Sequence, residues 1–326
     1  MGADRGPAEI VAGAVQVASA ELQPVIVGPA GLETRGLELI EASDVIEMDE
    51  KPTDAVRSKP DSSLVVACKA VGDGRADAVV SPGNTGAMLA ASLVHIRRVA
   101  GVLRPAIAVV IPARTGPNVL IDAGANADAR AEHLVQFAQM GLILSAEVLG
   151  VEEPEVRLLS IGEESEKGNQ LALEAHGLLE LHVDGFAGNT EGRDLIARGG
   201  QVVVADGFTG NVVLKVVEGT IRSLLDALRA EITSTGRGRI GGLLVRPGLR
   251  RLRERLDPDT YGGAYLLGLR GLAVIAHGNS SSRAIANAVR LAARGVEHDV
   301  VGRLAQRLGE TVLESGRSTT PIPQTR

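Results

Sequence analysis

The sequence predicts an α/β fold with a three-layer α/β/α arrangement, in which helices cover both faces of a mostly parallel sheet. Short apolar runs alternate along the chain with longer segments of helical periodicity. Most of these runs are apolar throughout, as is typical of strands that are covered on both faces. Clusters of Gly, Asn and Asp separate the two kinds of segment. Strands that alternate with helices in this way form βαβ units, and such units build a mostly parallel sheet.

The apolar runs are the predicted strands, and the periodic segments are the predicted helices. Strands are expected at Pro24–Val27, Ala78–Ser81, Ala106–Ile111, Val119–Asp122, Val156–Ile161, Val183–Ala187, Gln201–Ala205 and Leu272–Ala276. Helices are expected over residues 7–20, 61–71, 85–99, 131–149, 169–181, 210–234 and 281–313. No linker rich in Pro, Gly or Ser divides the chain, so residues 1–314 are predicted to form a single α/β domain. The polar tail 315–326 is predicted to be disordered.

Residues 218–262 differ from this pattern and are predicted to form a helical protrusion outside the sheet. Between Gly236 and Arg255 this segment holds seven arginines and one acid, Glu254. A GxGxxG string falls inside it, but the string follows a predicted helix, whereas a dinucleotide-binding turn follows a strand. The segment is therefore not a predicted nucleotide site.

Composition and charge exclude several classes of function. The net charge is −6 and aromatic residues make up 2% of the chain, which argues against a nucleic-acid partner. The single cysteine, Cys68, rules out an internal disulfide and a cysteine zinc site. The histidines show no metal-binding spacing, so we expect neither a metal nor another cofactor. No long uncharged apolar stretch occurs, and we expect a cytoplasmic protein without a membrane span.

Six predicted strand ends carry glycine together with Asn, Thr or Ser, and each leads into the next element. They are Pro82–Ala87, Ala123–Asn126, Gly162–Asn169, Gly188–Asp194, Asp206–Asn211 and His277–Ser282. Glycine lets the backbone approach a ligand closely, and free N–H groups at the start of a helix attract anions. A single such loop is more simply a helix cap. Because the carboxyl ends of parallel strands meet at one edge of a sheet, six of them predict a polar cleft that accepts an anion.

Seven strings, taken together, resemble the PlsX family of acyl-carrier-protein:phosphate acyltransferases. They are SPGNTGAMLA, LIDAGANADARAEHLVQFAQMG, IGEESEKGNQL, GNTEGRDL, ADGFTGNVVLK, YGGAYLLGL and AHGNSSSRAIANA. The resemblance runs from about Met1 to Leu308. It implies a fold similar to isocitrate and isopropylmalate dehydrogenases and to phosphotransacetylase, in a homodimer. The implied reaction converts the acyl thioester of acyl carrier protein and inorganic phosphate into acyl phosphate and free carrier protein. A glycerol-3-phosphate acyltransferase then uses the acyl phosphate in phospholipid synthesis.

The chain departs from the family pattern at its start. The family begins with a short strand that runs into an MGGD-type turn, whereas Met1-Gly2-Ala3-Asp4 begins at the turn and has alanine in place of one glycine. An inner strand of the sheet is therefore expected to be missing, which would leave backbone groups unpaired. We expect an initiator methionine further upstream.

The implied reaction needs placement of phosphate, stabilisation of an oxyanion and exclusion of water more than it needs a strong base. A substantial share of inorganic phosphate is already a dianion at neutral pH and is a usable nucleophile. The predicted phosphate-binding residues are Asn84, Thr85, Gly86, Arg193 and Lys215. The predicted catalytic residues are Lys167, Asn126, His133, Asp206 and His277. The predicted substrate loops hold Gly124, Asn169, Asn189, Glu191 and Asn211.

Several roles stay open at the level of the sequence. The proton carrier is His133, His277 or Asp206, and the oxyanion donor is Asn126, Asn189 or Asn211. Lys167 and Arg193 are the favoured cations for phosphate, but they can equally pair with neighbouring glutamates.

The basic protrusion and the activity each leave alternatives. The arginines, including Arg246, Arg250, Arg251 and Arg253, fit a solvated face, a contact with the acidic carrier protein, or a peripheral contact with anionic lipid at the inner face of the cell membrane. The rival activities are a phosphotransacetylase that uses acyl-CoA and a non-catalytic scaffold at the membrane. The thioester that the protein accepts separates the first rival, and tolerance of substitutions in the strand-end loops separates the second.

Overall fold

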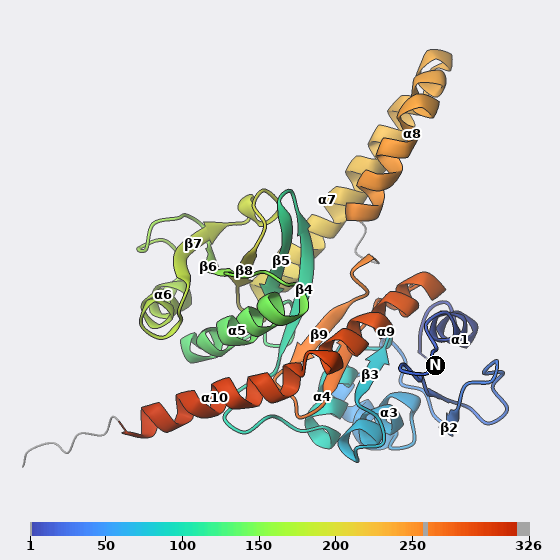
Figure 1. The fold of residues 1–326 in the computed structure, drawn as a ribbon, viewed down its shortest axis with the longest axis horizontal. Coiled ribbons are helices and arrows are strands. Elements are labelled where there is room, and N and C mark those ends of the chain that lie inside the picture. The colour runs from blue at the N-terminus through green and yellow to red at the C-terminus, as the bar shows by residue number, and fades with distance from the viewer. Residues whose placement is uncertain (1, 257–259, 318–326) are drawn as a thin grey trace, which may run out of the picture.

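The computed structural model describes residues 2–256 and 260–317, with side chains up to residue 308 (Figure 1). Its main sheet has eight strands in the order β3-β10-β9-β4-β5-β8-β6-β7, and β1 and β2 form a separate pair. The strands are β1 (Ile26–Gly28), β2 (Leu39–Glu41), β3 (Ala78–Ser81), β4 (Ala106–Ala113), β5 (Gly116–Ile121), β6 (Glu155–Ser160), β7 (Phe186–Glu191), β8 (Gln201–Val204), β9 (Ala264–Leu267) and β10 (Leu272–Ile275).

Helices cover both faces of the main sheet, as the sequence predicts. One apolar core packs the sheet against α5 (Ala131–Ile143), α6 (Gln170–His182), α9 (Ser282–Glu297) and α10 (Val300–Arg317). The opposite core packs it against α2 (Pro52–Ser58), α3 (Ser63–Gly72), α4 (Thr85–His95) and the first turns of α7 (Gly207–Thr233). The remaining helices are α1 (Pro7–Val15), η1 (Leu144–Val148), η2 (Asp194–Ile196) and α8 (Gly236–Leu256). The three-layer α/β/α prediction is therefore confirmed.

The main sheet is mostly parallel but reverses direction around β4. Strand β3 runs parallel to β10, and β5, β8, β6 and β7 are parallel to one another. Strand β9 is antiparallel to both of its neighbours, and β5 is antiparallel to β4. The sheet thus has two parallel groups of opposite direction, joined by β9 and β4. Figure 1 shows β4 and β5 as a long hairpin between the two groups.

The predicted elements differ from the structure at several places, and β2 and α2 lie outside all of them. Strand β9 is not among the predicted strands, since its short AYLL sequence directly follows two glycines. Strand β7 lies a few residues later than Val183–Ala187, because it includes the buried polar side chains of Asn189 and Thr190. The helix predicted over 281–313 is two helices, separated at Asp299, whose φ is 47°. Helix α10 continues to Arg317, so the tail expected from residue 315 is helical for three residues, and 318–326 lie outside the described residues.

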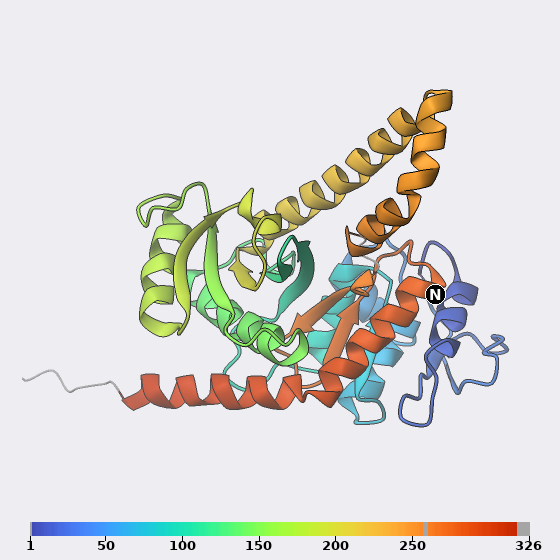
Figure 2. The ribbon, with the colours of Figure 1, turned by 45° about the horizontal axis from the view of Figure 1, so that its top comes forward.

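Helices α7 and α8 form a hairpin that projects from the body (Figures 1 and 2). Figure 2 shows that the two helices are closest at the tip and diverge towards the sheet. None of the helices within residues 2–256 and 260–317 combines the length and the hydrophobicity that crossing a bilayer requires.

Candidate active site

The reversal of the sheet brings two sets of strand ends to the same level. Strand β9 pairs with residues 106–109 of β4, whereas β5 pairs with residues 108–113. Ile275, the last residue of β10, is therefore level with Val109, and Ile121, the last residue of β5, faces Ala108. At this level of the sheet, the carboxyl ends of the two groups of strands point towards each other. We call this position, next to Ala108 and Val109 of β4, the step in the sheet. We expected all six loops at one edge of the sheet, after strands that run in a single direction, and this was wrong. The loops after β5 and β10 nevertheless approach the same level of the sheet.

The loop after β5 is held by a buried carboxylate. Asp122 is 0% exposed, and its two oxygens accept N–H groups of Ile107, Gly124, Ala125 and Asn126 at 2.7–3.1 Å. A buried carboxylate with this many donors fixes the turn, because each unpaired N–H group would be costly. Asp122 therefore fixes the conformation of the AGAN loop, residues 123–126, that follows it.

The start of α7 lies directly against this loop. A Cβ atom on Gly210 would lie 1.9 Å from the backbone oxygen of Asp122, and one on Gly207 would lie 2.7 Å from the backbone nitrogen of Asn126. Both positions therefore require glycine. A Cβ atom on Gly124, whose φ is 136°, would lie 3.5 Å from the side chain of Asn211. The loops after β5 and β8 form one unit.

Three predicted catalytic or phosphate-binding side chains in these loops are engaged in local structure. The amide of Asn126 donates to Pro105 and to Asp122, both at 2.8 Å. Asp206 caps α7, accepting from the backbone of Phe208 and Thr209 and from the Thr209 hydroxyl. The Asn84 oxygen caps α4 at Ala87, and its amide donates to backbone oxygens within residues 47–50. These side chains position the loops, and Thr85 and Gly86 follow at the first turn of α4.

The loop after β10 meets the N-terminal turn at the same step. The backbone N–H of Asp4 donates to the oxygen of Gly278 at 2.9 Å, and a Cβ atom on Gly278 would lie 3.2 Å from the end of Met48. The segment around Met48 also accepts the Asn84 amide. The loops after β3 and β10 and the N-terminal turn are therefore neighbours.

A line of charged side chains joins the two groups of loops. Lys215, two turns into α7, donates to Glu218 at 3.2 Å, and Glu218 lies 3.6 Å from Nε2 of His277. The Glu218 side chain is 15% exposed, whereas Lys215 and His277 are 59% and 41% exposed. The shielded carboxylate of Glu218 thus holds two accessible groups: Lys215, which can bind an anion, and His277, which can move a proton. Glu218 is not among the site residues that the sequence predicts.

The loops after β6 and β7 lie further along the sheet. Asn189 is buried, donates to the backbone of Glu164 at 2.8 Å and lies 2.9 Å from Nδ1 of His176. It therefore supports the loop that carries Lys167, which is exposed. Asn169 caps α6 at Ala172.

Arg193 lies far from the predicted phosphate residues of α4. It is 72% exposed and pairs with Glu191 at 3.1 Å, after the outermost strand of its group. Strands β3 and β7 lie at opposite ends of the eight-stranded order, which puts seven strand spacings of about 4.8 Å, or roughly 34 Å, between them. The structure therefore does not bring Arg193 and Asn84 to one phosphate ion.

The two candidate histidines lie on opposite faces of the sheet. His133 is in the first turn of α5, accepts the backbone N–H of Arg130 at Nδ1, and packs near Phe137. Burial, followed by the charges of Arg104 and Arg130, lowers the pKa of His133 below its ordinary value. His133 is therefore mostly neutral at pH 7. His277 contacts α7, which covers the other face.

The thiol of Cys68 takes no part in thioester chemistry. Its side chain is 0% exposed, and burial raises its pKa to about 11. Within the described residues, no group of three or more His, Cys, Asp or Glu side chains is placed to hold a metal ion.

Comparison with known proteins places this chain in a family. The model of the family described as fatty acid synthesis protein matches residues 1–303. The chain belongs to this family. It is 44% identical to a phosphate acyltransferase of Heliobacterium modesticaldum over 94% of this chain and 96% of the relative, and 45% identical to that of Thermotoga neapolitana over 92% and 93%. The family resemblance that the sequence strings indicate is thereby confirmed.

Two solved structures share the fold at low sequence identity. A branched-chain phosphotransacylase from Enterococcus faecalis V583 has a TM-score of 0.58 at 16% identity and covers 91% of this chain and 97% of its own. The EutD phosphotransacetylase from Staphylococcus aureus has a TM-score of 0.56 at 16% identity, with 88% and 90% covered. These likenesses agree with the three-layer fold.

Proposed function

We propose that the chain transfers a fatty acyl group from the thioester of acyl carrier protein to inorganic phosphate, which gives acyl phosphate and the free carrier thiol. The observation that carries this proposal is the line Lys215–Glu218–His277, which joins the loops of both strand groups in a chain of this family. The site has an exposed cation for an anion and an exposed imidazole for a proton, and both are oriented by one shielded carboxylate.

The reaction moves one proton, and His277 is suited to carry it. A phosphate oxygen of HPO4²⁻ attacks the thioester carbonyl, the carbon–sulfur bond breaks, and the phosphate proton ends on the sulfur. Glu218 faces Nε2 of His277 and favours a proton there, so Nδ1 is left to accept the phosphate proton and to pass it to the departing sulfur. The thiolate is a good leaving group because its conjugate thiol has a pKa of about 8.5.

Phosphate binds between Lys215 and the first turn of α4 in this proposal. Thr85 and Gly86 open that helix, whose N-terminal backbone favours an anion. Of the three candidate oxyanion donors we propose Asn211, beside Gly124, since its side chain is exposed and the Asn126 amide is already engaged. In this proposal Lys167 and Arg193 bind the donor thioester. They lie in the loops after β6 and β7, which we call the outer loops.

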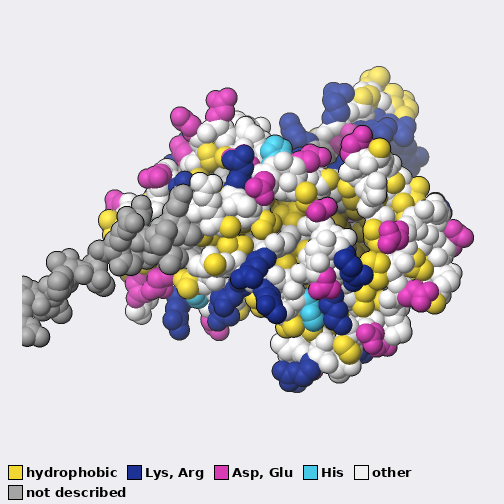
Figure 3. All heavy atoms as spheres, turned by 60° about the horizontal axis from the view of Figure 1, so that its bottom comes forward, with side chains coloured by type: hydrophobic (Ala, Val, Ile, Leu, Met, Phe, Trp, Pro, Cys, Tyr) yellow, Lys and Arg dark blue, Asp and Glu magenta, His cyan; other side chains and the backbone are white. Residues whose placement is uncertain are grey.

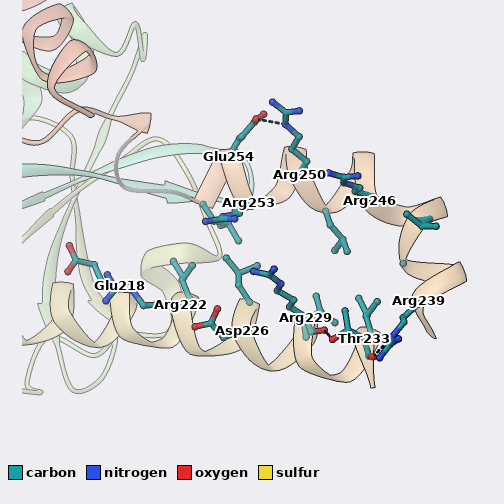
Figure 4. Close-up of a pocket in the computed structure, with 18 of the residues that line it drawn as sticks. Glu218, Arg222, Asp226, Arg229, Thr233, Arg239, Arg246, Arg250, Arg253 and Glu254 are labelled. Atoms are coloured by element: carbon teal, nitrogen blue, oxygen red, sulfur yellow. Dashed lines mark hydrogen bonds and ion pairs between the residues drawn. The ribbon is translucent and has the colours of Figure 1, made fainter. Parts of the chain in front are cut away.

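The α7–α8 hairpin accounts for two further partners. A groove of about 1030 Å³ lies between the helices (Figure 4). Asp226 lines it from α7, and Arg246, Arg250 and Arg253 line it from α8. The α7 wall also carries Arg222 and Arg229, and apolar side chains of both helices, such as Leu225 and Leu249, line the groove. Because a second copy of the hairpin could bury this apolar lining, we place the contact of a homodimer here.

The tip of the hairpin is proposed to touch anionic lipid at the inner face of the cell membrane. Ile240 is 67% exposed and Leu244 is 81% exposed, and Arg239 and Arg246 lie close to them in sequence. Apolar side chains among arginines suit the boundary of an anionic bilayer. A cytoplasmic enzyme at this boundary can pass acyl phosphate to a glycerol-3-phosphate acyltransferase.

One assay tests the proposed function. The purified protein is incubated with palmitoyl-carrier protein or with acetyl-CoA, each with ³²P-phosphate, and the labelled acyl phosphate is separated from free phosphate by thin-layer chromatography. We expect turnover with the carrier-protein thioester. Turnover with acetyl-CoA alone would instead assign a phosphotransacetylase, and no turnover with either thioester would favour the scaffold.

A further inference from the structure

A second basic surface lies away from the hairpin, at the start of β4 and α5. Five exposed arginines contribute to it: Arg97, Arg98, Arg104, Arg130 and Arg270. We call these residues, together with Leu103, the β4-entry patch. Figure 1 shows the loop between α4 and β4 along the lower side of the molecule, and Figure 3, which brings that side forward, shows Lys and Arg side chains gathered there.

Hydrogen bonds and charge effects show that the patch is one surface although its residues are distant in sequence. Arg270 donates from its backbone to Arg97 and from Nε to Arg98, and Arg98 donates to the backbone of Val102 and Leu103. The charges of Arg104 and Arg130 both lower the pKa of His133, and the backbone N–H of Leu103 donates to the side-chain oxygen of Gln136, in the next turn of α5. The loop is braced, so its arginines are displayed in a defined arrangement.

The patch has the chemistry of a docking surface for an acidic protein. Leu103 is 45% exposed among the arginines, which provides an apolar anchor inside a basic rim. Asp128 and Glu132 are the acids on the neighbouring stretch, so arginine predominates locally although the whole chain carries −6. Arginine guanidinium groups pair with carboxylates in a bidentate way, which suits a partner helix rich in Asp and Glu.

The patch also adjoins the candidate active site. Pro105, the residue after Arg104, accepts the side-chain amide of Asn126 at 2.8 Å, and Asn126 belongs to the loop that α7 packs against. A carrier protein presents its thioester at the end of a prosthetic arm, so the carrier itself must dock beside the site and not in it. The patch lies in such a position.

We propose that the β4-entry patch is the docking surface for the acidic carrier protein, and that the arginines of the hairpin are not. This inference rests on the proposed function, because it takes the donor to be a carrier-protein thioester. It divides the two basic regions of the chain between two partners, the carrier at the start of β4 and lipid at the hairpin tip.

The test compares charge reversals at the two ends of one strand. Arg104 and Arg114 flank β4, and an extended chain of ten residues puts them roughly 30 Å apart. In Arg104→Glu/Arg130→Glu, we expect KM for acyl carrier protein to rise at least tenfold and its dependence on salt to weaken. KM for phosphate and turnover of an acyl-pantetheine thioester should stay unchanged. Arg114→Glu should leave every parameter unchanged.

The outcomes separate the docking surface from the function. If the wild-type protein uses acyl carrier protein but the double variant keeps its KM and salt dependence, the docking surface is wrong and the function stands. A matching rise in KM for Arg250→Glu/Arg251→Glu alone would move the carrier to the hairpin and overturn the proposal. A loss of acyl-pantetheine turnover in the double variant would assign the patch to catalysis and also overturn it. Failure of the wild-type protein with every thioester would overturn the proposed function itself.

Discussion

The loop 122–126 and the first turns of α7 lie against each other, yet their polar side chains do different work. In the loop, Asp122 and Asn126 direct nearly all of their polar atoms to neighbouring backbone. On α7, Glu218 contacts both Lys215, on the same helix, and His277, in the loop after β10, and both of these side chains stay accessible. The comparison teaches that the Asp and Asn of a strand-end loop can be fully engaged in fixing its geometry, whereas the accessible groups are those that a carboxylate of the neighbouring helix holds.

The largest effect should come from removing the carboxylate that organises the loop. Asp122→Ala leaves several buried N–H groups without an acceptor, and we expect the free energy of unfolding to fall by about 3 kcal/mol or more. Urea denaturation followed by circular dichroism measures the change, with Asp128→Ala on the exposed side of the same segment as the control. Equal unfolding midpoints for the wild-type protein and Asp122→Ala would show that the loop is not the scaffold described above.

A smaller effect on stability but a large one on rate is expected at His277. His277→Ala should lower kcat about 100-fold with an unchanged unfolding midpoint, since a positioned proton carrier contributes on that order. Glu218→Gln should lower kcat less than His277→Ala does, because the amide orients the imidazole less firmly than the carboxylate. A kcat that is the same for Glu218→Gln and the wild-type protein would remove Glu218 from the mechanism.

Lys215 should affect phosphate binding more than it affects turnover. Lys215→Ala is expected to raise KM for phosphate about tenfold, in line with the loss of one charge-assisted contact, while KM for the thioester changes little. Lys215→Arg keeps the charge and should recover most of the affinity. If Lys167→Ala raised KM for phosphate and Lys215→Ala did not, the phosphate would belong to the outer loops.

The smallest effect concerns His133 and serves as the comparison with His277. Because burial lowers the pKa of folded His133, the unfolded chain binds more protons between that lowered pKa and about 6.5. The contribution of His133 is therefore complete above pH 6.5 and declines as the pH falls through this window. His133→Gln should flatten this part of the curve of unfolding midpoint against pH without changing kcat. A fall in kcat as large as that of His277→Ala would make His133 the proton carrier.

The fold could be predicted from the sequence because it follows from local patterns. The edges of β3 match the apolar run at residues 78–81, and the helix starts at Asn84, Asn169 and Asp206 follow capping rules. Asn189 misled the prediction of β7, because a buried polar residue inside a strand has the appearance of a loop.

The site could be predicted only in part. The loops are identifiable, and Asp122 could have been found as an Asp that ends a strand before residues with free N–H groups. The reversal of the sheet and the pairing of Glu218 with His277 depend on contacts between residues far apart in the chain. No local pattern around Glu218 distinguishes it from other acids on an exposed helix.

A crystal structure with phosphate, or with arsenate located by its anomalous signal, tests the central claim most directly. The account predicts one anion at the step in the sheet, within hydrogen-bond distance of Lys215 and the first turn of α4 and close to His277. An anion bound instead by Lys167 or Arg193 in the outer loops, with none at the step, would contradict it.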